Sequence, residues 1–279
     1  MNKIEIHNLN KEYPEFALKN VNFSVPEGYV TGFIGKNGMG KTTTIKSILS
    51  LVHYDGKILF RNGDTNAGLD NQKIGVIMED SFLAKDWNMD LVNKAMKVGY
   101  DEWDEKLYSQ YLTKFNIDRK LKVKELSRGM KIKLMLAIAL SHKAEVLILD
   151  EPTSGLDPSM REEFIEIISD YMQNDNHTVL FSTHITQDLE AIADYIVFVD
   201  DGKIVLSLEK DEFLNYFMVL KCDSDYQIAM DESAILGRKT SKYNIEYLVK
   251  RSAVNNIPPG CVEDKISIDR IMILYGRKR

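Results

Sequence analysis

The stretch that decides the fold covers residues 35–42 and reads Gly35-Lys36-Asn37-Gly38-Met39-Gly40-Lys41-Thr42. It matches the pattern G-x-x-x-x-G-K-[ST], in which a glycine-rich loop wraps its backbone N–H groups around phosphates. An apolar run precedes the loop, and a helical pattern follows it from Thr42 to Leu51. The free N–H groups and positive dipole end of that helix would face the phosphates. The stretch therefore predicts a nucleotide-binding loop.

Single residues of this loop have separate expected roles. Lys41 is expected to reach the β- and γ-phosphates, and the Thr42 hydroxyl is expected to ligate Mg2+. A glycine-rich turn without a ligand is the alternative, and the strand before the loop and the helix after it disfavour that alternative. The expected nucleotide contacts from this segment are Gly35, Asn37, Gly38, Gly40, Lys41, Thr42 and Thr43.

A second apolar run, Val146–Leu149, ends in two carboxylates, Asp150 and Glu151. Ligands of open α/β sheets bind at the carboxyl ends of the strands, so these acids are expected beside the phosphates. We expect Asp150 to hold Mg2+, directly or through water, and Glu151 to polarise the attacking water as the general base. His184 follows another apolar run and is expected to contact the γ-phosphate. Solvated acids and an ordinary surface histidine are the alternatives.

Strand-like and helix-like segments alternate along much of the chain, which indicates an α/β fold. Near-continuous apolar runs suit strands that are buried on both faces of a parallel sheet. Such runs occur at residues 146–149, 178–181 and 196–199. Helical spacing dominates from about residue 81 to 143, which predicts a mostly helical insertion. Beyond residue 211 the pattern weakens, and a last segment from Val262 to Tyr275 has roughly helical apolar spacing.

Composition excludes several classes of protein. The 279 residues carry a net charge of −6, whereas a nucleic-acid binder normally shows a basic excess or stripe. No stretch approaches the roughly 18 apolar residues of a membrane span, and the N-terminus lacks the apolar core of a signal peptide. We expect any membrane span to come from other chains. Cys222 and Cys261 are expected to be ordinary thiols rather than a disulfide framework.

The order of these motifs closely resembles the nucleotide-binding subunits of ABC transporters. Residues 126–130, Leu-Ser-Arg-Gly-Met, resemble the family signature Leu-Ser-Gly-Gly-Gln, and residues 154–157 resemble its D-loop. His184 matches the switch histidine, and Tyr13 stands where the family carries an aromatic side chain that stacks on adenine. An ordinary core tyrosine is the alternative for Tyr13. The resemblance covers roughly residues 3–208.

The resemblance implies a fold and a partnership. The fold would be the P-loop ABC ATPase fold, with a central parallel sheet, an antiparallel β subdomain and a helical insertion at about 81–143. Residues 1–210 would form the nucleotide-binding domain and residues 211–279 a small C-terminal extension. Two such domains would sandwich two ATP molecules, with Ser127 and Gly129 facing the ATP of the opposite subunit and Asp157 at the contact. The second domain would be an identical or a related subunit.

Two residues depart from the family pattern. Arg128 replaces the first glycine of the signature, and Glu79 stands where the family normally has glutamine. Glu79 is still expected to contact the nucleotide and Mg2+. Both departures resemble a branch of ABC-2-type exporters of low-GC Gram-positive bacteria, which includes the phenol-soluble modulin exporters.

The resemblance implies an ATPase at the cytoplasmic face of the membrane that drives export through a separate integral membrane permease. We expect a peptide, lipid or drug-like cargo and no nucleic-acid partner. A soluble, non-transport ABC ATPase is the main alternative, although such proteins usually carry two nucleotide domains or a long coiled coil. A regulatory subunit with an inactive site is a further alternative, which the complete set of catalytic positions disfavours.

Overall fold

The computed structural model describes residues 1–62, 65–67, 70–78, 82–224, 226 and 230–277. Their contacts divide the chain into two units, Met1–Val205 and Leu206–Arg279. The functional domain boundary near residue 210 stays a prediction. Among the described residues, no helix has both the length and the apolar character needed to cross a membrane.

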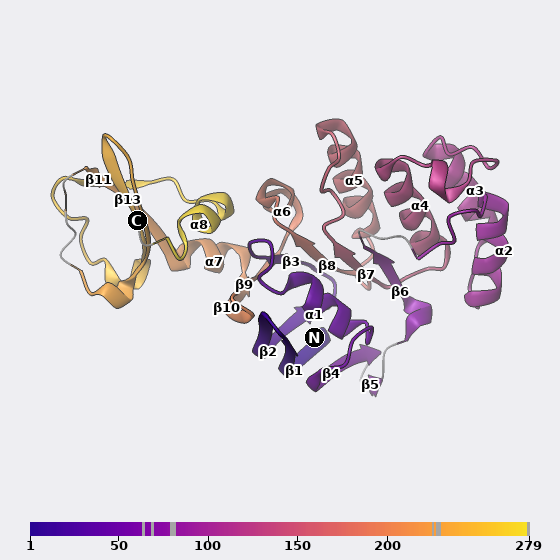
Figure 1. Ribbon diagram of the computed structural model, residues 1–279, viewed down its shortest axis with the longest axis horizontal. Helices are drawn as coiled ribbons and strands as arrows, with labels where there is room; N and C mark the ends of the chain where they lie inside the picture. Colours follow the sequence, from indigo (N-terminus) through magenta and orange to yellow (C-terminus); the bar gives the residue numbers. More distant parts are fainter. Residues whose placement is uncertain (63–64, 68–69, 79–81, 225, 227–229, 278–279) are drawn as a thin grey trace. The chain divides into compact units, whose positions relative to one another are not determined.

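The first unit is built on two sheets (Figure 1). An antiparallel sheet has the order β2-β1-β4-β5, and a six-stranded sheet has the order β10-β9-β3-β8-β7-β6, in which β9, β3, β8, β7 and β6 are parallel. The antiparallel strands are β1 (Asn2–Tyr13), β2 (Phe16–Pro26), β4 (Asp55–Asn62) and β5 (Thr65–Ala67). Those of the larger sheet are β3 (Val30–Ile34), β6 (Ile74–Ile77), β7 (Val146–Asp150), β8 (Thr178–Thr183), β9 (Tyr195–Asp200) and β10 (Lys203–Glu209).

The strands predicted to be buried on both faces are buried. All residues of β7 and β8 and residues 196–199 of β9 are buried, and so is all of β3, as expected for a sheet covered on both sides. Helix α1 (Lys41–Ile48) packs Ile45 and Ile48 into one core with residues of the antiparallel sheet. Helices α4 (Arg128–Ser141), α5 (Pro158–Tyr171) and α6 (Thr186–Ile192) lie on the other face of the parallel sheet (Figure 1). The predicted α/β fold is therefore confirmed.

The helical insertion lies between β6 and β7. It contains α2 (Met89–Gly99), α3 (Glu105–Lys114), the short 3-10 helix η2 (Val123–Glu125) and α4. Asn88 and Asp104 start α2 and α3, because their side chains accept hydrogen bonds from the backbone N–H of Leu91 and Leu107, each at 2.9 Å. Such caps satisfy the free donors of a first turn and stabilise a helix by about 1 kcal/mol.

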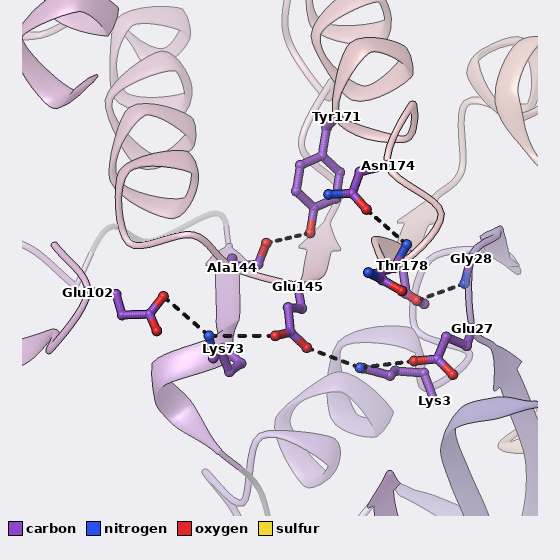
Figure 2. A network of polar contacts seen from close by, with 11 residues as sticks. Lys3, Glu27, Gly28, Lys73, Glu102, Ala144, Glu145, Tyr171, Asn174 and Thr178 are labelled. Carbon is purple, nitrogen blue, oxygen red and sulfur yellow. Dashed lines mark hydrogen bonds and ion pairs between the residues drawn. The ribbon is translucent and has the colours of Figure 1, made fainter. Parts of the chain in front are cut away.

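An ion-pair network ties the insertion to both sheets at the N-terminal ends of the parallel strands (Figure 2). Glu145, just before β7, pairs with Lys3 at 3.2 Å and with Lys73 at 3.6 Å. Lys3 also pairs with Glu27, and Lys73 with Glu102 of the insertion. Lys73 ends the 3-10 helix η1 (Asn71–Lys73), which leads directly into β6. The network thus fixes the base of the insertion at the edge opposite the predicted ligand edge.

The second unit is an antiparallel sheet with the order β12-β13-β11-β14. The predicted helical pattern from Val262 is wrong in its first part, because Val262 lies in a strand and the helix starts only at Ile268. The elements of this unit are α7 (Lys210–Tyr216), β11 (Phe217–Asp223), η3 (Glu232–Ala234), β12 (Ile235–Thr240), β13 (Asn244–Lys250), η4 (Arg251–Ala253), β14 (Cys261–Asp264) and α8 (Ile268–Leu274).

Cys222 and Cys261 form a disulfide, so the expectation of two ordinary thiols is wrong. The two residues are 39 positions apart in the sequence, but they lie directly opposite each other where β11 pairs with β14. The two cysteines meet only because β11 pairs with β14 in this register, and no pattern in the sequence predicts the register. Both side chains belong to the apolar cluster on one face of this sheet.

Candidate nucleotide-binding site

The glycine-rich loop runs from β3 to α1 and curls around the Lys41 side chain. Lys41 is buried, and its Nζ donates hydrogen bonds to the carbonyl oxygens of Gly35 at 2.7 Å and Lys36 at 3.3 Å. Gly40 precedes α1 with φ of 107°, a conformation that a residue with a side chain rarely adopts. The loop backbone therefore holds the Lys41 ammonium group in place.

Asp150 lies at the carboxyl end of β7, next to the Thr42 side chain. Ser182 of β8 donates a hydrogen bond of 3.0 Å to Asp150 Oδ1, and the Thr42 side chain is hydrogen-bonded to the same carboxylate. Burial raises the pKa of Asp150, although these two hydrogen bonds lower it in part. A cation beside Thr42 and Asp150 would favour the ionised carboxylate, so this pair fits Mg2+, which prefers oxygen ligands.

Glu151 is held from both sides at the end of the same strand. Its Oε1 lies 3.3 Å from Lys41 Nζ, and its Oε2 accepts hydrogen bonds from the His184 backbone N–H at 3.2 Å and pairs with His184 Nδ1 at 2.6 Å. The backbone of Glu151 has φ of 51°, a conformation that costs a non-glycine residue roughly 1–3 kcal/mol and occurs often at active sites. Among the described residues, the buried Oε1 accepts no hydrogen bond, and its contact is the ion pair with Lys41.

These side chains border one cavity of about 360 Å³ at the ligand edge of the sheet. Six residues of the predicted phosphate loop, the general base and the histidine therefore lie around a single space. Gly35 and Asp150 are not in this lining, but each contacts a residue that is: Gly35 accepts a hydrogen bond from Lys41, and Asp150 is hydrogen-bonded to Thr42. The lining residues are Phe16, Asn37, Gly38, Gly40, Lys41, Thr42, Thr43, Arg128, Glu151, Ser154 and His184.

Two residues of the signature, Ser127 and Gly129, lie elsewhere. Ser127 is exposed and caps α4, accepting a hydrogen bond from the Met130 N–H at 3.2 Å. Gly129 packs against Met160 of α5, where a Cβ would collide with the methionine side chain. Within the described part of the chain, neither Ser127 nor Gly129 borders the cavity. Glu79 lies outside the described residues.

Tyr13 also does not border the cavity, as far as the described residues show. Its ring is 43% exposed at the end of β1, with Lys11 Nζ at 5.1 Å from the ring centre. Phe16, which pairs with Tyr13 across the β1–β2 turn, borders the cavity instead. Phe16 was not among the predicted site residues, although it is an aromatic residue only three positions after Tyr13.

Within the described ranges, no group of three or more His, Cys, Asp or Glu side chains could enclose a metal ion. That result is compatible with Mg2+ at Thr42 and Asp150, since Mg2+ usually takes few protein ligands and completes its shell with phosphate oxygens and water. The site thus combines a phosphate loop, an oxygen pair for a cation and a carboxylate for water activation.

Comparison with known proteins gives the family. The family profile described as ABC transporter matches residues 18–154. The lantibiotic transport ATP-binding protein SrtF of Streptococcus pyogenes is 38% identical over 217 residues, which is 75% of this chain and 91% of SrtF. The bacitracin transport ATP-binding protein BcrA of Enterococcus faecalis is 34% identical over 223 residues, which is 72% of this chain and 68% of BcrA.

The solved structures agree. The structure titled as the ATP-binding subunit of an ABC transporter is 26% identical, with a TM-score of 0.65 over 75% of this chain and 90% of that one. A nucleotide-free ATP-binding cassette at 21% identity has a TM-score of 0.63 and supports the fold alone. The chain belongs to the ABC transporter family as an ATP-binding subunit, whose domain binds and hydrolyses ATP to power transport.

Proposed function

We propose that two nucleotide-binding domains close around two ATP molecules and drive export through a separate membrane permease. The observation that carries this proposal is the division of the machinery in the chain. Lys41, Thr42, Glu151 and His184 border one cavity, whereas the signature residue Ser127 stands outside it. A second domain that presents its own Ser127 would complete the site.

The roles of the site residues follow from their geometry. Lys41 leaves its pair with Glu151 and binds the phosphates, and the loop N–H groups hold the phosphate oxygens in place. Glu151 accepts a proton from the attacking water, and His184 orients the Glu151 carboxylate through the 2.6 Å contact. Thr42 and Asp150 would hold Mg2+, which would offset phosphate charge during the transfer. Tyr13 supplies an exposed ring face for adenine.

ATP would act as a clamp between the domains. A ligand shifts a conformational equilibrium only by its difference in affinity for the two states. The γ-phosphate supplies that difference, because it would touch the loop of one chain and the signature of the other. Hydrolysis removes this bridge, and the pair loosens.

A groove between the helical insertion and the segments that follow α1 and form β6 is the proposed contact with the permease. It has a volume of about 360 Å³ and is mainly apolar. Its lining includes Phe82, 67% exposed, and Leu51, 52% exposed, and apolar side chains that gather in an exposed groove mark a protein-interaction site. A short helix of a membrane subunit at the cytoplasmic face would cover them. The lining includes Leu49, Leu51, Val76, Phe82, Leu83, Met96, Tyr100, Met135, Ile138 and His142.

The names of two relatives support the kind of cargo. SrtF is named for lantibiotic transport and BcrA for bacitracin transport. We therefore propose export of a peptide or of a similar amphipathic compound.

The test is purification of the tagged chain from detergent-solubilised membranes of its own host. The proposal expects a hydrophobic membrane subunit to accompany it, and expects that subunit to stimulate ATP hydrolysis in proteoliposomes. An ATPase that leaves the membrane entirely and turns over fully without a partner would favour the soluble, non-transport alternative instead.

A further inference from the structure

We propose that Arg128 binds the γ-phosphate of the ATP held by its own chain, whereas its neighbours Ser127 and Gly129 face the ATP of the partner. The first turn of α4 would then contact two ATP molecules at once, one bound by its own chain and one bound by the partner. This inference rests on the proposed function, because it concerns how the same site is completed.

The position of Arg128 separates it from the rest of the signature. Arg128 borders the 360 Å³ cavity together with Lys41, Thr42 and Glu151 of the same chain. Ser127 and Gly129 are absent from that lining, within the ranges that the structure describes. The side chain of Arg128 thus leaves α4 in a different direction from the residues on either side of it.

The arginine side chain passes beside Gly155. A Cβ built on Gly155 would lie 3.5 Å from Arg128 Cδ and Nε and 3.7 Å from Cζ, so the guanidinium passes beside the D-loop backbone. Gly155 has φ of 73°, which favours glycine and keeps this surface free of a side chain. Ser154, the residue before it, also borders the cavity. The arginine therefore reaches the cavity over the D-loop of its own chain.

Charge at the site favours a phosphate as the ligand of Arg128. A cation in the first turn of a helix is opposed by the helix dipole, so this position gains nothing from α4 itself. Glu151 already places a negative charge beside Lys41, so a triphosphate that enters the cavity adds to an excess of negative charge that a second cation would offset. A guanidinium presents planar, parallel N–H donors that match phosphate oxygens and are always charged.

The consequence is a link from the nucleotide to the permease groove within one chain. Met135, Ile138 and Ala139, further along α4, line the apolar groove described above. A γ-phosphate bound by Arg128 would fix the position of the first turn of α4, whose later turns line the apolar groove. Loss of that phosphate would remove this constraint on α4.

The test compares ATP and ADP binding by isothermal titration calorimetry. All proteins carry Glu151→Gln to prevent turnover. Because this variant is expected to dimerise with ATP, sedimentation with ATP first finds the protein concentration below which it stays monomeric, and the titrations are done there. Arg128→Ala should lower ATP affinity by about tenfold, the size expected for a lost charge-assisted hydrogen bond, and should change ADP affinity by less than twofold. Arg128→Lys should restore part of the loss. The charge-matched control is Lys124→Ala. Lys124 lies four residues before Arg128, and its exposed ammonium group pairs with Asp86.

Each outcome is decisive. A loss that is specific to ATP in the monomer supports the inference, and retained ADP binding shows that the variant is folded. Unchanged ATP affinity, an equal loss for ADP, or a loss seen only in dimers would overturn it, the last by placing Arg128 on the partner's phosphate. If the Glu151→Gln protein with Arg128 intact binds ATP but never dimerises, the proposed function fails separately.

Discussion

Lys41 and Glu151 form an ion pair in the lining of the phosphate cavity, with Nζ 3.3 Å from Oε1. The residue expected to bind the phosphates and the residue expected to activate water thus neutralise each other. ATP binding has to separate them, and the same event frees Glu151 for the water. Substrate binding and activation of the base are therefore one step in this site.

The first prediction is that Glu151→Gln uncouples binding from hydrolysis. The amide cannot accept the proton from water, so ATPase activity should fall by at least about a hundredfold, within the range for general bases. It also removes the competitor of ATP for Lys41, so monomeric ATP affinity should rise. Calorimetry and size-exclusion chromatography with ATP would show tighter binding and accumulated dimers. Turnover at the rate of the unmodified protein would exclude Glu151 as the base.

The second prediction separates the two sides of the interface. Ser127→Arg places a bulky side chain where the partner's phosphate would sit, so hydrolysis should be crippled while ATP binding to the monomer stays nearly intact. Ser127→Ala is the control, because it removes the N-cap hydrogen bond of α4 without adding a bulky side chain. Loss of that cap costs about 1 kcal/mol of helix stability. A comparable loss of monomer binding in Ser127→Arg would instead assign Ser127 to the site of its own chain.

The third prediction concerns the stability cost of Asp150. Burial raises its pKa above the ordinary 3.8. A carboxyl group with a raised folded-state pKa destabilises the fold at neutral pH, and this penalty disappears as the pH falls towards the unfolded value. Asp150→Asn should therefore raise the urea midpoint at pH 8 without Mg2+ or nucleotide, and the gain should shrink as the pH falls towards 3.8. It should also abolish hydrolysis. A gain that is independent of pH would refute this explanation.

The fourth prediction concerns the disulfide of the second unit. A cross-link between residues 39 positions apart lowers the conformational entropy of the unfolded chain. In the chain-entropy model this raises the free energy of unfolding by about 4 kcal/mol. Cys222→Ser with Cys261→Ser should lower the unfolding free energy of residues 206–279 by up to that amount, as measured by hydrogen exchange. Exchange in the first unit should not change. Equal protection in the cysteine-free protein would show that the cross-link does not stabilise the unit.

The fifth prediction tests the permease groove. Phe82→Asp puts a charge among apolar side chains that we expect a partner helix to cover, so recovery of the membrane subunit should drop at least tenfold. Val98→Asp is the matched control, because Val98 is 89% exposed on α2 and does not belong to the groove lining. ATP binding by the isolated chain should be unchanged in both. Equal recovery of the partner with the two variants would place the docking surface elsewhere.

What could be predicted from the sequence was largely local. The loop before Thr42 and the acids after β7 are contiguous motifs, and the buried strands are continuous apolar runs, so their positions followed from short stretches. The alternation of such runs with helices also gave the parallel sheet, because each crossover needs a helix to return the chain. The carboxyl ends of parallel strands then share an edge, which is why Glu151 and His184 meet.

What could not be predicted depends on pairing at a distance. Strand β12 carries exposed Arg238, Lys239 and Thr240, so its sequence lacks the apolar run that marks a buried strand. The partnership of Cys222 with Cys261 depends on the register of β11 and β14. The path of Arg128 depends on the packing of α4 beside the D-loop, which no spacing in the sequence specifies.

The central claim is that each ATP is hydrolysed by residues from two domains. The most direct measurement is specific ATPase activity of the purified chain as a function of its concentration, with sedimentation at each point. The account predicts that specific activity rises with the dimer fraction and falls towards zero on dilution to monomer. Undiminished specific activity from strictly monomeric protein would contradict it.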